Sequence, residues 1–392
     1  MQNTKLNILK AVTFLAGSAL SADMAAAKNG WTAVSDVVGQ VSTATVAGGG
    51  SPLYIAPKPQ FSGSVGLLMD YGAGGAFVCS GTLINSVSVV TAAHCVSDGG
   101  TARPLSTTVF FYDGADDPSL YAAGSPATRI AVSSIIVNPL YSGEVVDEND
   151  IAILKLSQVA PSFAPFVALS GLADLTSIDH TVAGYGARSN SGGTNGTLTG
   201  FGLGTGRLRY AENRFDFRFG DADFAGYWNG AFGAQSVDNV WISDFDNGTA
   251  FRDGSCNVGI FEGLTNPVFS SSKYCDLGRG AREGIGAGGD SGGSYYVDGK
   301  LAAVHSFALW YRNDESANRF GQLKGAVPIY LHRDFIAANA VPEPATWGMM
   351  IAGFGLVGAS LRLRDKNVGA SLRLRDKKVG ASLRRSRKLA TA

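Results

Sequence analysis

The chain has 392 residues, of which 45% are hydrophobic and 16% charged, and it contains 52 glycines. This length and apolar content suffice for a buried core, and many glycines with few long helical patterns favour β structure rich in turns. The formal net charge is zero, yet residues 357–392 carry +9 and residues 28–341 carry −9. An acidic folded part argues against nucleic acid as a partner.

Residues 1–27 have the order of a secretory signal peptide. Lys5 and Lys10 precede an apolar run over 11–20, and Ala25-Ala26-Ala27 offers a small-residue cleavage site. The apolar run is too short to span a membrane. An ordinary N-terminal helix is the alternative. Export would place the four cysteines in an oxidising compartment, where we expect them to be paired.

Residues 28–60 are rich in Gly, Ala, Ser and Thr and are expected to form a pro-segment or linker. From Phe61 onward, short apolar runs alternate with Gly and Asp clusters, which is the pattern of an all-β protein. Pro161 and Pro165 mark a crossing segment. A terminal helix is predicted over 331–338, and strands are predicted over 64–68, 77–84, 87–92, 107–112, 131–137, 151–156 and 180–185.

Three motifs follow one another along this β region. His94 lies in Thr-Ala-Ala-His-Cys, Asp150 precedes an apolar strand in Asn-Asp-Ile-Ala, and Ser291 lies in Gly-Ala-Gly-Gly-Asp-Ser-Gly-Gly. A hydroxyl nucleophile, a base and an orienting carboxylate are the parts of a Ser-His-Asp acyl-transfer site. Each residue alone would be structural or solvated by default. Together and in this order they resemble the trypsin/chymotrypsin family of serine proteases, over about residues 61–337.

The resemblance implies an all-β fold with two antiparallel six-stranded β-barrels and a C-terminal helix. The protease domain would span residues 61–340, split near 165–175, with the active site between the barrels. Ser291 would be the nucleophile, His94 the base and Asp150 the carboxylate that orients it, while the backbone N–H groups of Gly289 and Ser291 would form the oxyanion hole. No metal or other cofactor is expected. A degenerate, inactive homologue is the alternative.

The cysteines fit the same resemblance. Fifteen residues separate Cys79 from Cys95, which matches the family disulfide beside the catalytic histidine. The family pairing leaves Cys256 and Cys275 as the second disulfide. Without the family, four cysteines allow three connectivities.

One segment departs from the family. The stretch before Ser291 is about twice the usual family length, and the surplus lies within about residues 188–255. It is rich in Gly, Asn, Asp and aromatic residues, as in Asp244-Phe245-Asp246-Asn247-Gly248. Clustered Asp near Gly could ligate calcium. No twelve-residue loop with regular ligand spacing is present, so solvated hairpin loops are the favoured interpretation.

Asp290 has two interpretations. In the family, the Asp before the nucleophile pairs with the α-ammonium group that propeptide removal creates. Val46-Ala47-Gly48-Gly49 is the nearest match to the family's new N-terminus, and it is a poor one. Either activation occurs there or Asp290 is neutralised in another way.

The specificity pocket is assigned by the same resemblance. Ile285 would lie at its base, followed by Gly286, and a strand with Ser306, Phe307 and Ala308 would run along the substrate backbone. Ser306 would also support Asp150. Ile285 offers no carboxylate for a basic side chain, so a neutral apolar preference is expected. Alternatively, His305 lies behind the pocket, as in glutamate-specific relatives, although it is more often a core histidine.

The C-terminal part carries a second set of signals. Val341-Pro342-Glu343-Pro344 leads into an uncharged stretch through Leu361, which Arg362 and Arg364 follow. Residues 341–364 thereby resemble the PEP-CTERM sorting signal of Gram-negative bacteria, which an exosortase processes. Flanking Arg would hold the end in the cytoplasm during a transient membrane contact. An ordinary membrane anchor is the alternative. Residues 365–392 are expected to be a basic repeat tail without a catalytic role.

These inferences predict a secreted serine endopeptidase that acts on polypeptide substrates. It would be sorted to the cell surface or extracellular matrix of a Gram-negative bacterium, with an exosortase-type enzyme as a processing partner. The competing prediction is a non-catalytic surface or matrix protein that keeps the barrels as a binding module.

Overall fold

The computed structural model describes residues 25–26, 31–34, 52–114, 119–122, 124–188, 204–261, 272–311 and 320–340. The chain divides into two units, Met1–Ala340 and Val341–Ala392, and all described residues belong to the first. Apart from Ala25 and Ala26, the predicted signal peptide lies outside the described residues, as do the sorting signal and the basic tail. Within the described ranges, no helix has the length and apolar character needed to cross a membrane.

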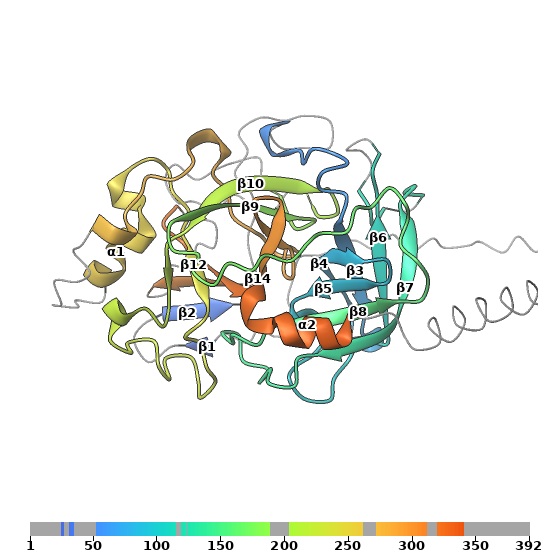
Figure 1. Cartoon of the computed structure of the whole chain (residues 1–392), viewed down its shortest axis with the longest axis horizontal. Coiled ribbons are helices and arrows are strands. Elements are labelled where there is room, and N and C mark those ends of the chain that lie inside the picture. Colours follow the sequence, from blue (N-terminus) through green and yellow to red (C-terminus); the bar gives the residue numbers. More distant parts are fainter. Residues whose placement is uncertain are drawn as a thin grey trace, which may run out of the picture. The chain divides into compact units, whose positions relative to one another are not determined.

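Six strands close into an antiparallel barrel in the order β3-β4-β5-β8-β7-β6 (Figure 1). Alternate residues of the first strand, Val65, Leu67 and Met69, are buried in its interior, where they meet residues such as Leu83 and Leu154. The six strands predicted for this region are confirmed. They are β3 (Ser64–Asp70), β4 (Ala76–Asn85), β5 (Ser88–Thr91), β6 (Ser106–Phe111), β7 (Thr128–Val137) and β8 (Ala152–Leu156).

A second antiparallel sheet follows the order β10-β9-β13-β14-β15-β12-β11. Its path is open in the described residues, whereas the first barrel is closed. The predicted strand over 180–185 is β9 (Ile178–Gly184). The other strands are β10 (Arg209–Phe215), β11 (Phe217–Arg218), β12 (Trp241–Ser243), β13 (Ser294–Val297), β14 (Lys300–Tyr311) and β15 (Leu323–Pro328). The fold is therefore all-β, as expected, with one closed barrel beside a second antiparallel sheet.

The predicted terminal helix is also confirmed. It is α2 (Arg333–Asn339), and it follows the 3₁₀ turn η9 (Ile329–His332). Its Ile336 belongs to the same buried cluster as Val90 and Ile153 of the barrel and Val304 of the second sheet, so this cluster joins the two sheets. The other short helices are α1 (Gly254–Phe261), η1 (Pro52–Tyr54), η2 (Gly72–Gly74), η3 (Ala93–Cys95), η4 (Ala222–Phe224), η5 (Ala250–Arg252), η7 (Ser272–Tyr274) and η8 (Gly280–Arg282).

The surplus segment is not a set of solvated hairpin loops in its described part, from residue 204. It supplies β10, β11 and β12, and its aromatic side chains form a buried cluster with Phe307 and Leu309 of β14. Asp244 and Asp246 are only 2% and 4% exposed. The prediction of loops was wrong because Phe215, Phe217 and Phe219 alternate with polar residues. This alternation lets one face of the chain be buried, although the amino-acid composition of the segment is typical of loops.

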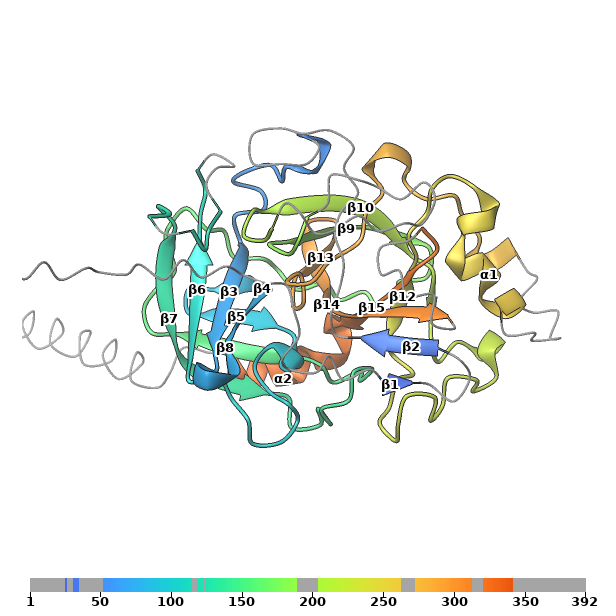
Figure 2. The same cartoon turned by 180° about the vertical axis from the view of Figure 1, so that it is seen from behind.

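A strand from the N-terminal region joins the second sheet. β2 (Trp31–Val34) pairs antiparallel with β14, with Val34 opposite Ala308 and Trp31 opposite Tyr311, and β1 (Ala25–Ala26) pairs with β2 (Figure 2). β15 takes the other edge of β14. β2 therefore lies along the same edge as β13, farther along β14.

Candidate active site

His94 and Asp150 form a tight pair between two short connections. His94 lies on η3, directly after β5, and Asp150 lies just before β8. His94 Nδ1 is 2.7 Å from Asp150 Oδ2, and the backbone N–H of His94 donates to Asp150 Oδ1 at 2.8 Å. A carboxylate at Nδ1 fixes the proton on that nitrogen and leaves Nε2 as the basic one.

Ser306, on β14 of the second sheet, completes the environment of Asp150. Its hydroxyl donates to Asp150 Oδ2 at 2.5 Å, and Asp150 is 1% exposed. Burial works against the charged carboxylate, but the neighbouring His94 and the hydrogen bonds from His94 and Ser306 outweigh it and lower the pKa of Asp150. Asp150 therefore stays ionised beside the imidazole.

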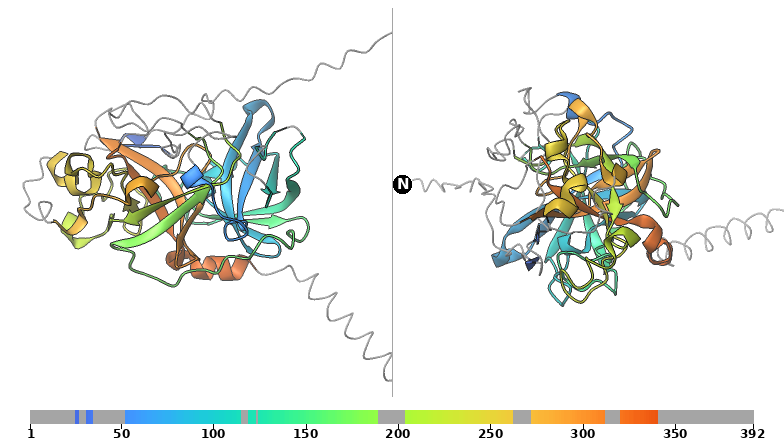
Figure 3. Two further views of the ribbon diagram at one scale, coloured as in Figure 1. Left: turned by 90° about the horizontal axis from the view of Figure 1, so that it is seen from above. Right: turned by 90° about the vertical axis from the view of Figure 1, so that its left-hand side faces the viewer.

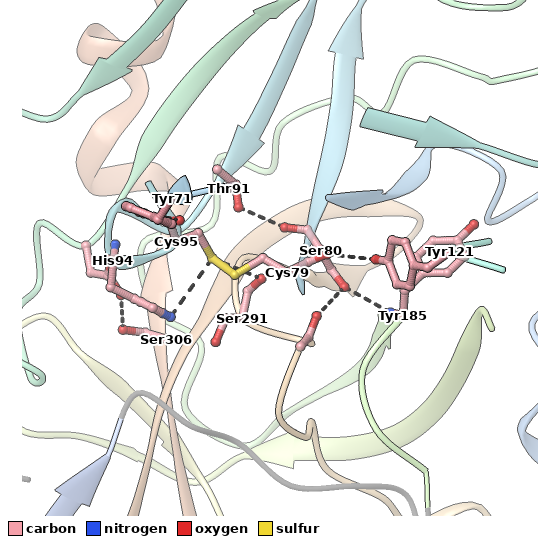
Figure 4. Close-up of a disulfide and its surroundings, with 12 residues drawn as sticks. Tyr71, Cys79, Ser80, Thr91, His94, Cys95, Tyr121, Tyr185, Ser291 and Ser306 are labelled. Carbon is pink, nitrogen blue, oxygen red and sulfur yellow. Dashed lines mark hydrogen bonds and ion pairs between the residues drawn. A yellow bond between two sulfur atoms is a disulfide. The ribbon is translucent and has the colours of Figure 1, made fainter. Parts of the chain in front are cut away.

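Ser291 lies in the turn before β13, next to the Cys79–Cys95 disulfide (Figure 4). Its carbonyl oxygen accepts from the backbone N–H of Ser80 at 2.9 Å and lies 3.5 Å from Cys95 Sγ. The same sulfur is 4.0 Å from His94 Nε2. Three residues far apart in the sequence, His94, Asp150 and Ser291, are thus brought together around one disulfide.

Two glycines of the Ser291 turn have left-handed backbone conformations. Gly289 has φ +97° and Gly292 has φ +76°. A Cβ atom at Gly292 would collide with Thr91 Oγ1, and one at Gly289 would lie 3.1 Å from both Gly186 Cα and Val78 Cγ2. Side chains at these positions are therefore excluded by conformation and by space together.

Comparisons with known proteins give two family matches. Residues 57–205 match the trypsin family model, and residues 340–364 match the PEP-CTERM protein-sorting motif. The first match covers the closed barrel and β9 of the second sheet. The trypsin match includes His94 and Asp150 and ends before Ser291.

Curated relatives of this domain include proteases described as inactive. The chain is 37% identical over 110 residues to serine protease SP24D of Anopheles gambiae, covering 28% of this chain and 35% of that protein. It is 39% identical over 87 residues to the inactive serine protease PAMR1 of Bos taurus, covering 20% of this chain and 11% of that protein. The matched part is thus about a third of the first relative and a ninth of the second. Among solved structures, HL collagenase aligns with 20% identity and a TM-score of 0.45, covering 74% of this chain and 98% of that one.

Both disulfides are those expected. Cys79 pairs with Cys95 and Cys256 with Cys275, and no cysteine is free. The first joins β4 to η3, and the second joins α1 to the segment after η7. Their sulfurs are thereby unavailable as metal ligands.

Asp290 is held inside the fold by backbone donors. Its carboxylate accepts from the N–H groups of Gly186 at 2.6 Å and Ala287 at 2.7 Å. Burial raises the pKa of Asp290 to about 6, and these two hydrogen bonds oppose the rise. Backbone N–H groups thus accommodate the carboxylate of Asp290 in this structure.

The predicted pocket residues are mostly buried. Ile285 and Ala308 are buried, and a Cβ atom at Gly286 would lie about 3 Å from the ring of His305. His305 is fully buried, its Nδ1 lies 2.7 Å from the hydroxyl of Tyr295, and its Nε2 has no hydrogen-bond partner. A separate cavity of about 370 Å³, lined by residues that include Phe61, Phe166 and Tyr296, contains none of the predicted site residues.

Ser80 was not predicted as a site residue, although it connects three parts of the site. Its hydroxyl donates to the carbonyl of Gly289 at 2.9 Å and accepts from the N–H of Tyr185, and its carbonyl accepts from Thr91 Oγ1. Together with its backbone bond to Ser291, these contacts fix the turn against β4 (Figure 4). A lone serine after a cysteine carries little signal in the sequence.

The loop that carries Asp150 is also supported by residues that the sequence did not reveal. Glu148 accepts from the backbone and side chain of Asn239 at 3.0 and 3.1 Å, and its carbonyl lies 2.7 Å from His332 Nε2. Asn239 belongs to the surplus segment and His332 to η9. The surplus segment therefore takes part in holding the Asp150 loop.

Proposed function

We propose that this protein is an exported serine endopeptidase that cleaves polypeptides through Ser291, His94 and Asp150. The observation that carries the proposal is the hydrogen-bonded chain from Ser306 through Asp150 to His94 Nδ1, which leaves His94 Nε2 basic. A His held in this way can remove the proton of a serine hydroxyl.

In this mechanism Ser291 Oγ attacks the carbonyl carbon of the scissile bond and His94 Nε2 accepts the hydroxyl proton. Asp150 stabilises the imidazolium that forms. The backbone N–H groups of Gly289 and Ser291 bind the oxyanion. His94 then donates its proton to the leaving amine, which leaves an acyl-enzyme on Ser291. Water, deprotonated by His94, attacks the acyl carbon and releases the second product with Ser291 restored.

A fluorophosphonate probe tests the proposal directly, because its reaction requires both an activated serine and an oxyanion hole. Wild-type protein should be labelled at Ser291, and Ser291→Ala and His94→Ala should not be labelled. Asp150→Asn should lower kcat on the order of 10⁴-fold. The alternative is a non-catalytic binding module, and some relatives are described as inactive. This alternative would be supported if folded wild-type protein without its N-terminal region were not labelled.

Residues 28–60 are proposed to act as a pro-segment. β2 pairs with the edge of β14 that also receives the Ser291 turn, since Gly292 N–H donates to the carbonyl of His305 and His305 N–H donates to the carbonyl of Gly293. An extended polypeptide that approached Ser291 along this edge would compete with β2 for the same backbone groups. Removal of the segment is therefore expected to open the edge.

Export is proposed from the two ends of the chain. The sorting motif over 340–364 supports processing by an exosortase-type enzyme, with a transient membrane contact, and delivery to the surface or matrix of a Gram-negative bacterium. Intact mass of the exported protein tests this, because it should lack residues 1–27 and the basic repeats over 365–392. A mature form that retains Ala392 would contradict the processing.

A further inference from the structure

Five carboxylates are buried together where the end of β12, the start of α1 and the segment before Ile285 meet. Asp216, Asp244, Asp246, Asp253 and Glu283 are each no more than 4% exposed. The backbone N–H of Asp244 donates to Asp216 at 3.0 Å, and that of Asp246 approaches Glu283 Oε1 at 3.5 Å. These five residues are called the acidic cluster below.

Three members of the acidic cluster converge on one point. One carboxylate oxygen each from Asp244, Asp246 and Asp253 lies within 4.8 Å of the other two. Asp244 and Asp253 are oriented by the backbone, because Ser255 N–H donates to Asp244 at 2.9 Å and Cys256 N–H donates to Asp253 at 2.7 Å. Their positions are therefore set by the first turn of α1.

A second, independent observation that points to a ligand is a buried oxygen of Asp246 without a hydrogen-bond partner. This oxygen is Oδ1, and nearly every buried polar atom in a folded protein has a partner. This carboxylate reaches the point on which Asp244 and Asp253 converge. A buried carboxylate that has an oxygen without a donor and that lies beside two other carboxylates is typical of a cation ligand.

The charges of the acidic cluster are not balanced by side chains. In the described ranges, none of its five members forms an ion pair with Lys, Arg or His, and the neighbouring Asp276 is paired with Arg214 at 3.5 Å. The fold thus concentrates negative charge at a place that a bound cation would stabilise.

We propose that Asp244, Asp246 and Asp253 bind one calcium ion, with Glu283 as an additional carboxylate at its side. Calcium accepts six to eight oxygen ligands in flexible geometry, so backbone carbonyls or water would complete the shell. Magnesium requires a stricter octahedron and keeps several waters, which a buried group of carboxylates serves less well.

The bound ion would join parts of the chain that no regular secondary structure connects. Asp244 and Asp246 follow β12, Asp253 precedes α1, and the Cys256–Cys275 disulfide ties α1 to the segment that leads to Glu283. Glu283 lies two residues before Ile285 at the base of the predicted pocket. Calcium would therefore stabilise the surplus segment and the approach to the pocket together. The site stands whether or not the protein is a peptidase.

The test uses the full exported chain, freed of metal by a chelator. Calorimetric titration with calcium should give one site, with a dissociation constant of about 10⁻⁴ M or tighter. Terbium should bind at the same site and give luminescence sensitised by nearby aromatic residues, of which Trp241 on β12 is one. Saturating calcium should raise the melting temperature by about 5 °C.

Asp246→Asn removes the charge and keeps the shape, and Asp298→Asn, in an exposed turn, is its matched control. Asp246→Asn should lose the terbium signal and the calcium-dependent rise in melting temperature, while remaining folded without calcium because one repulsive charge is gone. Asp298→Asn should behave as wild type. The proposal is overturned if calcium gives neither heat nor a thermal shift, if Asp246→Asn keeps the shift, or if magnesium at equal concentration shifts the melting temperature as much as calcium.

Discussion

Ser306 donates its hydroxyl hydrogen bond to the same Asp150 oxygen that faces His94 Nδ1, so one carboxylate atom links the second sheet to the histidine of the first barrel. The two halves of the proposed active site are joined through this atom. The orientation of His94 is therefore expected to depend on a residue that never reaches the substrate carbonyl.

Ser306→Ala should lower kcat about tenfold with little change in KM. A hydrogen bond to a charged group contributes roughly 1.5–3 kcal/mol, part of which would be lost as poorer positioning of Asp150. Steady-state kinetics on a peptide substrate provide the measurement. Ser62→Ala is the control, because Ser62 is buried but its hydroxyl has no hydrogen-bond partner. Equal kinetic effects of the two substitutions would contradict a positioning role for Ser306.

Removal of the Cys79–Cys95 disulfide should affect both activity and stability, whereas removal of the Cys256–Cys275 disulfide should affect mainly stability. Each closes a short loop and should stabilise the fold by roughly 2–4 kcal/mol. Cys79→Ala/Cys95→Ala should also abolish most peptidase activity, because Cys95 lies between His94 and the Ser291 backbone. Cys256→Ala/Cys275→Ala should lower the melting temperature and retain most of kcat. Melting curves and initial rates, measured below both melting temperatures, distinguish the pairs.

Substrate specificity should follow the apolar side chain of Ile285, which offers no carboxylate at the predicted base of the pocket. A panel of peptides varied at the residue before the scissile bond should show a preference for apolar side chains over Lys and Arg. The buried His305 Nε2, which has no partner and lies close to Gly286, keeps the glutamate alternative testable. A glutamate preference that weakens in His305→Ala would establish that alternative, and a strong Arg or Lys preference would show that the pocket is misplaced.

His180 should lower the free energy of unfolding as the pH falls below 6.5. This side chain is buried between Phe215 and Tyr295, and burial lowers its pKa to about 3. Between pH 6.5 and 3 the unfolded chain therefore binds a proton that the folded protein does not, so the free energy of unfolding drops as the pH falls. His180 should therefore contribute about 2 kcal/mol less to the free energy of unfolding at pH 5 than at pH 7. Buried carboxylates with raised pKa values, such as Asp290, change the stability in the opposite direction, so the comparison must isolate His180. Urea unfolding of Ser291→Ala with and without His180→Gln should show that the variant lacking His180 loses less stability, or gains more, between pH 7 and pH 5.

Weakening β2 should activate the enzyme. Thr32→Pro/Ala33→Pro removes two backbone N–H groups from a strand paired with β14, which should destabilise that pairing. We expect the initial rate on a short peptide to rise severalfold, whereas Thr32→Ala, which keeps its N–H, should leave it unchanged. Intact mass must confirm that residues 28–60 are still attached. If the double proline variant and Thr32→Ala, both with residues 28–60 attached, cleaved the peptide at equal rates, β2 would not be inhibitory.

The sequence allowed the barrel and the core of the site to be predicted because their signals are local. Alternating apolar residues between turns marked β3 to β9, and the motifs around His94, Asp150 and Ser291 marked the site. The strands β10 to β12 were missed because Gly, Asn and Asp surround the alternation of Phe215, Phe217 and Phe219. The pairing of β2 with β14 and the contacts of Ser80 depend on residues far apart in the chain, for which a single sequence offers no periodic signal.

The last described residue, Ala340, is held against the first barrel by side-chain hydrogen bonds. The carbonyl of Ala340 accepts from Asn85 Nδ2 at 2.5 Å and from Ser88 Oγ at 3.1 Å, and Ser88 in turn accepts from the buried Lys155. These three partners belong to the first barrel, and Ala340 is also the first residue of the sorting motif. A cut at the Pro-Glu-Pro sequence would therefore fall just beyond the final hydrogen bonds of the domain. Release from the sorting apparatus would then leave this end of the folded domain held in place, where other proteases reach it less readily.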